Sequence, residues 1–257
     1  MKNQSLASYI IISFILIIFF IFTIFPIIFV LLFSFKKNFI NNYLIVLRNY
    51  DFGIYILNSL FVSIVGAVLS VLICLLAAYF FYKNKTKLSS WLLTFITLSF
   101  LFPAEAKVIY NFFIIMKLNL LDKLVSVFLP FLVNLYTLLL FIQAFRYYSK
   151  EIDDYTELEG FNIFQKIFLI HIPILKPYII TGFIMNFLTL WNDFLWPLIV
   201  LQDEKKYTIQ VGINYIAKSL IFEPLYFSAA VSISIIIPIL IFIVFNKYFS
   251  VKNTVNI

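Results

Sequence analysis

Long apolar stretches, nearly free of charged residues, dominate this chain of 257 residues. A helix needs about 20 mostly apolar residues to cross the hydrocarbon core of a bilayer, which is about 30 Å thick. Five stretches reach that length with at most one charged residue each: 9–35, 58–82, 125–145, 178–201 and 225–245. A sixth, 88–116, is apolar but interrupted by Pro103, Glu105 and Lys107. We therefore predict an all-α integral membrane protein with six transmembrane helices, folded as one domain over residues 1–257.

The composition supports a lipid environment and excludes several kinds of site. Hydrophobic residues make up 63% of the chain and charged residues 12%, which is more apolar surface than a soluble domain of this size buries. Cys74 and His171 are the single cysteine and histidine, which excludes a disulfide, a Cys/His metal site and a Ser-His-Asp triad within this chain. The five glycines are too dispersed for a phosphate-binding loop. We therefore expect this chain to bind no metal and no cofactor, and any nucleotide chemistry to come from another subunit.

The basic residues lie in short loops between the apolar stretches. The net charge is +7, but no basic face forms, so membrane-flanking charge is a better interpretation than a nucleic-acid partner. The first apolar run exceeds the signal-peptide core of about 7–15 residues, and we expect a retained first span. With an inside N-terminus, ten Lys and Arg residues fall inside and nine outside, so the positive-inside rule barely decides the orientation. The short basic loop 83–87 favours the inside.

The longest charged segment, residues 146–176, separates the fourth and fifth apolar stretches. Ser149 is a suitable helix N-cap, and acids that follow it are stabilised by the positive end of a helix. Gly160 interrupts this pattern, and a second amphipathic piece continues until Pro173 and Pro177 stop it. The segment holds five acids: Glu151, Asp153, Asp154, Glu157 and Glu159. We therefore predict two short helices that meet at a glycine, lie along the membrane surface and contact a partner.

This loop resembles the hallmark of the importer permeases of the ATP-binding cassette (ABC) class, a cytoplasmic loop of the form E-A-A-x-x-x-G, nine residues, then I-x-L-P. Asp154, Tyr155 and Thr156 stand at the E-A-A positions, and Gly160 follows at the required spacing. Nine residues later come residues 170–173, which read I-H-I-P. The spacing is preserved to the residue, although Asp replaces Glu and two larger side chains replace the alanines.

Other segments resemble the carbohydrate branch of that family, in the same order. Residues 191–198 read W-N-D-F-L-W-P-L and look like the W-N-E-F-L-W-P-L stretch of maltose-type and glycerol-phosphate-type permeases. Residues 207–212, Y-T-I-Q-V-G, resemble the T-L-x-V-G that follows it. Further pieces fit upstream: Pro26 with Ser34-Phe35-Lys36, Asn58-Ser59, Ala77-Ala78-Tyr79, Leu120-Leu121-Asp122 and Gln143-Ala144-Phe145. The resemblance therefore spans nearly the whole chain.

The resemblance implies one permease subunit of an ATP-driven importer for a sugar or related small solute. It implies as partners a second permease subunit, two copies of an ATP-binding subunit that uses ATP and Mg, and an extracytoplasmic solute-binding protein. The charged loop would be a coupling helix set into the ATP-binding subunit, with the loop and both termini on the cytoplasmic side of a bacterial inner membrane. Acids on such a helix pair with arginines, while Leu158 and Phe161 add apolar contact. The implied docking residues are Asp154, Tyr155, Thr156, Leu158, Glu159, Gly160 and Phe161.

The fifth apolar stretch carries four candidates for the translocation pathway: Asn186, Trp191, Asn192 and Asp193. Polar groups in lipid need partners and tend to face the bundle interior or a pathway. The alternative is that Trp191 and Trp196 mark an interfacial belt and that Asp193 forms a structural pair. For Gly160 the alternative is an ordinary helix stop. We expect His171 to be a structural or surface residue rather than a proton carrier.

Two other classes of protein stay open at this point. A self-sufficient ion-coupled secondary transporter or channel would use intramembrane ionisable residues or inverted repeats, and this sequence has little buried charge and no visible repeat. A membrane enzyme would need His, Cys, paired carboxylates or metal ligands that face one compartment, and we find no such constellation in the sequence.

Overall fold

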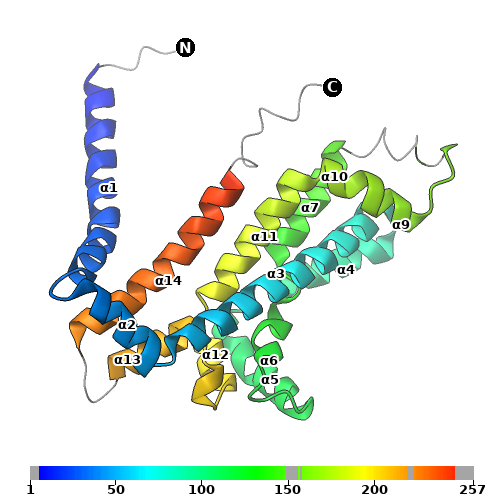
Figure 1. Ribbon diagram of the computed structural model, residues 1–257. Coiled ribbons are helices and arrows are strands. Elements are labelled where there is room, and N and C mark those ends of the chain that lie inside the picture. The colour runs from blue at the N-terminus through cyan, green and yellow to red at the C-terminus, as the bar shows by residue number, and fades with distance from the viewer. Residues whose placement is uncertain (1–5, 149–155, 157, 219–222, 247–257) are drawn as a thin grey trace. The chain divides into compact units, whose positions relative to one another are not determined.

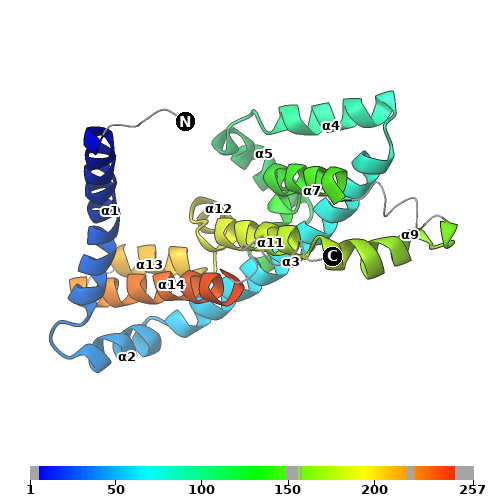
Figure 2. The same cartoon turned by 90° about the horizontal axis from the view of Figure 1, so that it is seen from above.

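The computed structural model of the chain describes residues 6–148, 156, 158–218 and 223–246, and within these ranges every element is a helix. The chain divides into two compact units. The terminal unit comprises Met1–Phe52 and Ile213–Ile236, and the main unit comprises Gly53–Gly212 and Ile237–Ile257. Figures 1 and 2 show the helices in chain order, from the blue α1 to the red end of α14.

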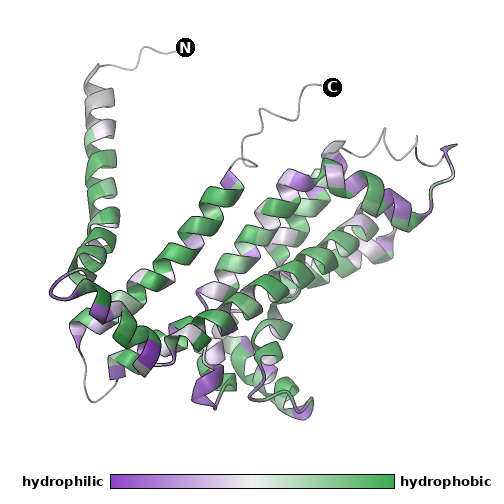
Figure 3. Cartoon of the chain, in the orientation of Figure 1, coloured by the Kyte–Doolittle hydropathy of each residue, from purple (hydrophilic) through white to green (hydrophobic). Residues whose placement is uncertain are grey.

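The terminal unit contains α1 (Leu6–Ser34), α2 (Phe39–Asn49) and parts of α13 (Ile209–Lys218) and α14 (Pro224–Phe245). α1 is apolar along almost its whole described length, as expected of a helix in lipid (Figure 3). It ends at a corner where the Asn42 side chain donates to the carbonyls of Ser34 and Lys36, at 3.2 Å and 3.0 Å. These bonds satisfy carbonyls that the helix end leaves open, and they give the Ser34-Phe35-Lys36 piece a structural role.

The main unit contains the long helix α3 (Phe52–Lys83) and several shorter helices (Figures 1 and 2). After α3 come α4 (Lys87–Ser99), α5 (Ala104–Lys117), α6 (Leu124–Phe128), η1 (Leu129–Phe131) and α7 (Leu135–Tyr148). The later elements are α9 (Ile163–Gln165), the π-helix η2 (Lys166–His171), α10 (Ile172–Ile174), α11 (Lys176–Trp191), α12 (Leu195–Val200) and η3 (Glu204–Lys206).

The described helices include three that are long and apolar enough to cross a membrane: α1, α3 and α14. Two further pairs pass the same test but are bent, by 50° between Phe131 and Leu135 and by 84° between Ile174 and Lys176. The described residues thus give three to five candidate spans by length and composition, and the all-helical membrane fold is confirmed. The six-span count stays a prediction.

Three of the predicted spans are broken rather than continuous. The stretch 88–116 divides at Pro103 into α4 and α5, and 125–145 divides into α6 with η1 and α7. The stretch 178–201 stops at Trp191 and resumes as α12. Proline explains the first break, because it cannot continue the hydrogen-bond ladder of the preceding helix.

Two apolar clusters lie at different heights along α3. The Phe145 cluster joins α3, α7, η2 and Leu175, and its buried members include Leu75, Tyr79, Phe141, Phe145 and Ile167. The Trp196 cluster joins α3, α5, α6, α11 and α12, and its buried members include Val62, Ile115, Phe128, Leu190 and Trp196. One continuous helix therefore connects both ends of the main unit.

Glycine allows close helix contacts in the main unit. A Cβ on Gly66 would lie 2.5 Å from Leu190 Cδ1 and 2.7 Å from Phe128 Cβ. A Cβ on Gly212 would lie 2.2 Å from Tyr55 Cδ2. Small residues at contacts between membrane helices let the backbones approach closely. Van der Waals packing at such contacts stabilises helix association in lipid, where no hydrophobic effect acts between helices.

Candidate functional site

The predicted docking residues fall at the start of the described part of the charged loop. Asp154 and Tyr155, with the proposed cap Ser149, lie outside the described residues. Thr156 is buried, Leu158 is 89% exposed, Glu159 is exposed and Phe161 is half-buried. Gly160 has φ +73°, in the left-handed region that favours glycine.

Gly160 ends a helical turn in a recognisable way. The Phe161 N–H donates to the Thr156 carbonyl at 3.1 Å, across five residues. A left-handed glycine at the position before this donor is the Schellman arrangement, which closes a helix C-terminus. The backbone at Gly160 thus has a conformation that favours glycine, whereas the helix pair that meets there and its coupling role stay predictions.

The second half of the loop begins directly after this glycine. Asn162 and Gln165 form a capping box, in which each side chain accepts from the other's backbone N–H at 2.9 Å. The helix then continues through η2 and α10, and it bends by 84° into α11. This helical run ends at Ile174, one residue after Pro173, and Pro177 lies in the first turn of α11, so both prolines flank the bend where the amphipathic piece is expected to stop.

His171 anchors this loop to the helices beside it. Its side chain is 1% exposed, and its ring centroid lies 5.4 Å from Tyr79 and 5.2 Å from Phe145. Tyr79 and Phe145 are the aromatic residues of two separate pieces of the family resemblance, on α3 and α7. The structure thus explains both pieces by their contact with the loop, and the expectation of a structural histidine is confirmed.

Asn186 joins three helices inside the main unit. Its Oδ1 accepts from the Ser70 hydroxyl of α3 at 2.9 Å. Its Nδ2 donates to Thr137 Oγ1 of α7 and to the Gly182 carbonyl, both at 2.8 Å. Trp191, one helical turn or so further on, is 1% exposed and stacks on Phe187 with centroids 5.5 Å apart. Both side chains therefore lie in the interior, as expected for polar and amphipathic groups within a bundle.

Asn192 and Asp193 occupy the break between α11 and α12. Asn192 is exposed, whereas Asp193 is half-buried. Asp193 Oδ1 accepts from the Trp196 N–H at 3.4 Å, and Oδ2 is buried without a hydrogen-bond partner among the described residues. Trp196 itself is 3% exposed and donates from Nε1 to the Ser126 carbonyl at 2.9 Å. Trp196 is therefore a packing residue of this break rather than part of an exposed interfacial belt.

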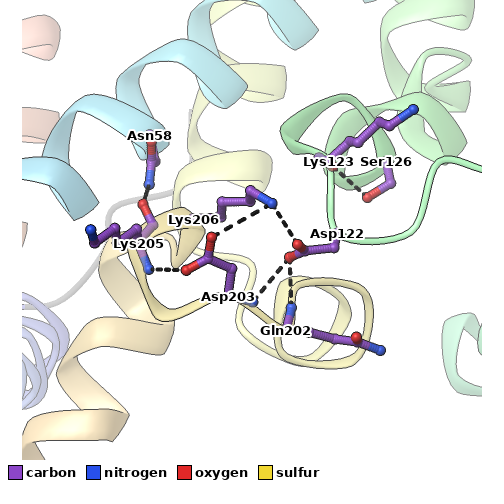
Figure 4. A network of polar contacts seen from close by, with 8 residues as sticks. All are labelled: Asn58, Asp122, Lys123, Ser126, Gln202, Asp203, Lys205 and Lys206. Atoms are coloured by element: carbon purple, nitrogen blue, oxygen red, sulfur yellow. Dashed lines mark hydrogen bonds and ion pairs between the residues drawn. The ribbon is translucent and has the colours of Figure 1, made fainter.

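A polar network closes the end of the main unit near the Trp196 cluster (Figure 4). Asp122 Oδ1 accepts from the backbone N–H groups of Gln202 and Asp203, at 2.9 Å and 3.0 Å, and Oδ2 pairs with the Lys206 ammonium. The Asn58 side chain donates to the carbonyls of Lys205 and Tyr207, at 2.9 Å and 3.1 Å. We call these contacts the Asp122 network.

Hydrogen bonds lower the pKa of Asp122 from 3.8 to about 2. The bond from the Asp203 backbone N–H has the largest effect, and the bond from the Lys206 side chain has the next largest. The same hydrogen bond to Asp122 raises the pKa of Lys206 above its ordinary value. Both charged forms are thus stabilised by the pair.

Sequence reasoning did not assign Asp122 or Lys206 to any site. Leu120-Leu121-Asp122, Asn58-Ser59 and 207–212 were recognised as separate family-like pieces, and the structure brings all three together. Each of these pieces has a polar residue at the boundary of an apolar stretch. Polar residues at such boundaries indicate loops that bond to one another. Among the described residues, no group of three or more His, Cys, Asp or Glu side chains gathers as metal ligands.

Discontinuous helices with polar residues at the breaks are typical of membrane transport proteins, and the fold is of that class. The chain belongs to the family of binding-protein-dependent transport system inner membrane components, whose model matches residues 70–253. It is therefore a multi-pass inner-membrane protein and a transport component, and the resemblance to ABC importer permeases is confirmed.

Several curated relatives carry permease names. The lactose transport system permease protein LacG of Rhizobium radiobacter is 30% identical over 162 residues, which cover 63% of this chain and 59% of LacG. The arabinooligosaccharides transport system permease protein AraQ of Bacillus subtilis is 26% identical over 77% of this chain and 71% of AraQ. The sn-glycerol-3-phosphate transport system permease protein UgpE of Yersinia pestis is 26% identical over 63% of this chain and 58% of UgpE.

A solved structure supports the fold over almost the full length. A chain of a bacterial ABC transporter involved in the import of the acidic polysaccharide alginate superposes with a TM-score of 0.86. The match covers 97% of this chain and 100% of that chain, at 22% sequence identity. At that identity the likeness defines the architecture.

Proposed function

We propose that this chain is the transmembrane permease subunit of an ATP-driven importer for a sugar or related small solute. It would form half of the translocation pathway and couple to a cytoplasmic ATPase. The observation that carries the proposal is the family match over residues 70–253, in a family named for transport that depends on a binding protein. The names of the curated relatives, which concern lactose, arabinooligosaccharides and sn-glycerol-3-phosphate, support the solute class.

The proposed assembly contains a second permease subunit, two copies of an ATP-binding subunit and an extracytoplasmic solute-binding protein. ATP and Mg would act on the ATP-binding subunits. For this chain we propose a single domain over residues 1–257, with six spans counted as in the sequence and with both termini in the cytoplasm. The basic turn between α3 and α4 supports that orientation, because lysines next to a span favour the cytoplasmic side.

The proposed coupling element is the helix that ends at Gly160. Its docking residues would be Asp154, Tyr155, Thr156, Leu158, Glu159, Gly160 and Phe161. Three observations support this role: Leu158 presents a large apolar side chain, Glu159 is exposed beside it, and the Gly160 cap fixes where the helix stops. An exposed Leu next to a carboxylate is suited to a groove with apolar walls and a basic rim.

The pathway candidates divide into two kinds. Asn186 and Trp191 are packed in the interior, and we propose that they shape the pathway wall from behind. Asn192 and Asp193 lie at a helix break, where the Asn192 amide is exposed and the buried Asp193 Oδ2 lacks a hydrogen-bond partner among the described residues. Sugar hydroxyls bind such groups, so we favour this pair for direct contact.

The test is to purify the tagged full-length chain in mild detergent and identify the proteins that accompany it. We expect an ATP-binding subunit and a second permease, with the ATP-binding subunit lost in Asp154→Lys because charge at the dock is reversed. Glu151→Lys makes the same charge change three residues earlier, at an acid that we expect to be solvated, and it should retain the subunit. Recovery of this chain alone, from a preparation that still transports, would overturn the proposal in favour of ion coupling.

A further inference from the structure

The turn between α3 and α4 carries positive charge that no acid offsets. Three of the five residues from Lys83 to Lys87 are lysines, and no Asp or Glu occurs between Asp51 and Glu105. Lys85 and Lys87 are exposed, and neither has a salt-bridge partner among the described residues. Such a turn has charge complementarity to an anion.

The backbone of this turn is held by its own side chains. Thr86 caps α4 by accepting the Ser89 N–H at 3.2 Å, and the Ser89 hydroxyl donates to the carbonyls of Asn84 and Thr86. The Asn84 side chain donates to the Phe80 carbonyl at 3.1 Å. The turn is thus preorganised, and the groups that it presents outward are the lysine side chains.

An aromatic and apolar face continues from these lysines along α4. Trp91 is 72% exposed and lies four residues after Lys87, so the two share a helix face. With Ser90 and Thr94 it lines a shallow hollow. Leu88 and Phe95, at 68% and 75% exposed, extend the apolar surface on either side of Trp91. Along this face the lysines come first, with Leu88 beside Lys87, then the Trp91 indole, then Phe95. Positive charge, then an indole, then an apolar ring is the order in which a bilayer presents phosphate, glycerol and acyl chain.

We propose that the α3–α4 turn and the first turns of α4 form a binding site for an anionic phospholipid. Lys85 and Lys87 bind the phosphate region, the Trp91 indole lies at the level of the glycerol backbone, and Phe95 contacts an acyl chain. The continuous apolar face selects a lipid over a free anion. This site goes beyond the proposed function, because it concerns the lipid and neither the solute nor the ATPase.

The experiment is native mass spectrometry of the full-length protein in mild detergent, titrated with phosphatidylglycerol in competition with phosphatidylethanolamine. Lysines near an anionic lipid contribute about fivefold each to binding, so Lys85→Gln with Lys87→Gln should weaken phosphatidylglycerol retention by roughly 25-fold. Trp91→Leu keeps both charges and should give a smaller loss. Lys117→Gln with Lys123→Gln is the matched control, since it removes two exposed lysines that flank Asp122, and it should leave retention unchanged.

Three outcomes would overturn the site. One is equal phosphatidylglycerol retention in the Lys85/Lys87 variant and its control. Another is full competition by soluble glycerol phosphate, which would indicate an anion site without a lipid. The third is loss of a co-purifying permease in the Lys85/Lys87 variant with lipid retention unchanged, which would make the face a subunit contact. None of these three measurements involves the ATP-binding subunit. A result that rejects the lipid site therefore leaves the proposed importer function standing.

Discussion

The two ends of the main unit are held together by different forces. At the Trp196 end, carboxylate and amide side chains bond directly to loop backbone, through Asp122 and Asn58. At the Phe145 end, the contacts of the loop that follows Gly160 include ring packing of His171 against Tyr79 and Phe145. Hydrogen bonds depend on direction, whereas ring packing tolerates small shifts.

The loops at the two ends also differ in the side chains that they expose. The Asp122 network satisfies the loops from within, so its polar groups are largely used. The other end leaves large apolar side chains in the open: Leu158, Ile163, Phe164 and Leu169. Exposed apolar side chains of this size indicate a contact surface. From the contacts of their loops, we expect the Trp196 end to keep its shape and the loop around Gly160 to be completed by another molecule.

The largest expected effect is at Gly160. Proline fixes φ near −65°, so Gly160→Pro cannot adopt the observed +73° and should remove the helix stop. We expect recovery of the ATP-binding subunit with the tagged chain to fall at least about tenfold. Gly160→Asn, which reaches the left-handed region more easily than other residues, should retain most of it. Normal recovery with proline, at equal membrane levels, would show that the cap has no part in docking.

A substitution at Gly66 tests how tightly the helices pack in the Trp196 cluster. Gly66→Ala places a Cβ 2.5 Å from Leu190 and 2.7 Å from Phe128, and overpacking of this kind costs about 1–3 kcal/mol. The apparent Tm in detergent should fall by several degrees. Gly53→Ala is the control, because a Cβ there meets nothing within 4 Å. Equal melting of the two variants would mean that the helices separate easily at this contact.

A smaller effect is expected from the Asp122 network. Asp122→Ala removes the acceptor for two backbone N–H groups and the partner of Lys206, so the apparent Tm should fall by a few degrees. Asp122 has φ +57°, a conformation that Asn accepts more readily than Ala, so Asp122→Asn isolates the charge and should cost less. If both variants melt like the parent, the loops at this end are held by apolar packing alone.

The pH dependence gives the smallest signal. A lowered pKa means that the Asp122 contribution is complete above the ordinary value of 3.8 and is lost as pH falls toward about 2. The Tm difference between parent and Asp122→Asn should therefore be constant from pH 5 to 8 and shrink by about half at pH 3. A difference that already disappears at pH 5 would contradict the ion pair.

The sequence was most informative where its signal is local. The length of an apolar run predicts a helix in lipid, and glycine spacing located the junction at Gly160, because both depend on neighbouring residues. The breaks were harder to foresee. Residues 191–194 contain no proline. The break after Trp191 has one local bond, from the Trp196 N–H to Asp193 Oδ1, and one to a distant segment, from Trp196 Nε1 to the Ser126 carbonyl. Such contacts override local propensity.

Site residues show the same limit. Asp122 stood in the sequence as part of one short piece, and its partners lie 80 to 84 residues away. Asn186 was recognised as polar in an apolar stretch, but its bonds to Ser70 and Thr137 require the fold. A single sequence reveals that such a residue needs partners, without revealing which ones.

The continuity of α3 has a mechanical consequence. Val62, in the Trp196 cluster, and Tyr79, in the Phe145 cluster, stand on one helix without a break, about 25 Å apart at 1.5 Å per residue. Its neighbours α4–α5, α6–α7 and α11–α12 are jointed, whereas α3 behaves as a rod. If the charged loop tilts α3 at Tyr79, we expect an unbroken helix to carry that tilt to the residues around Val62 at its other end.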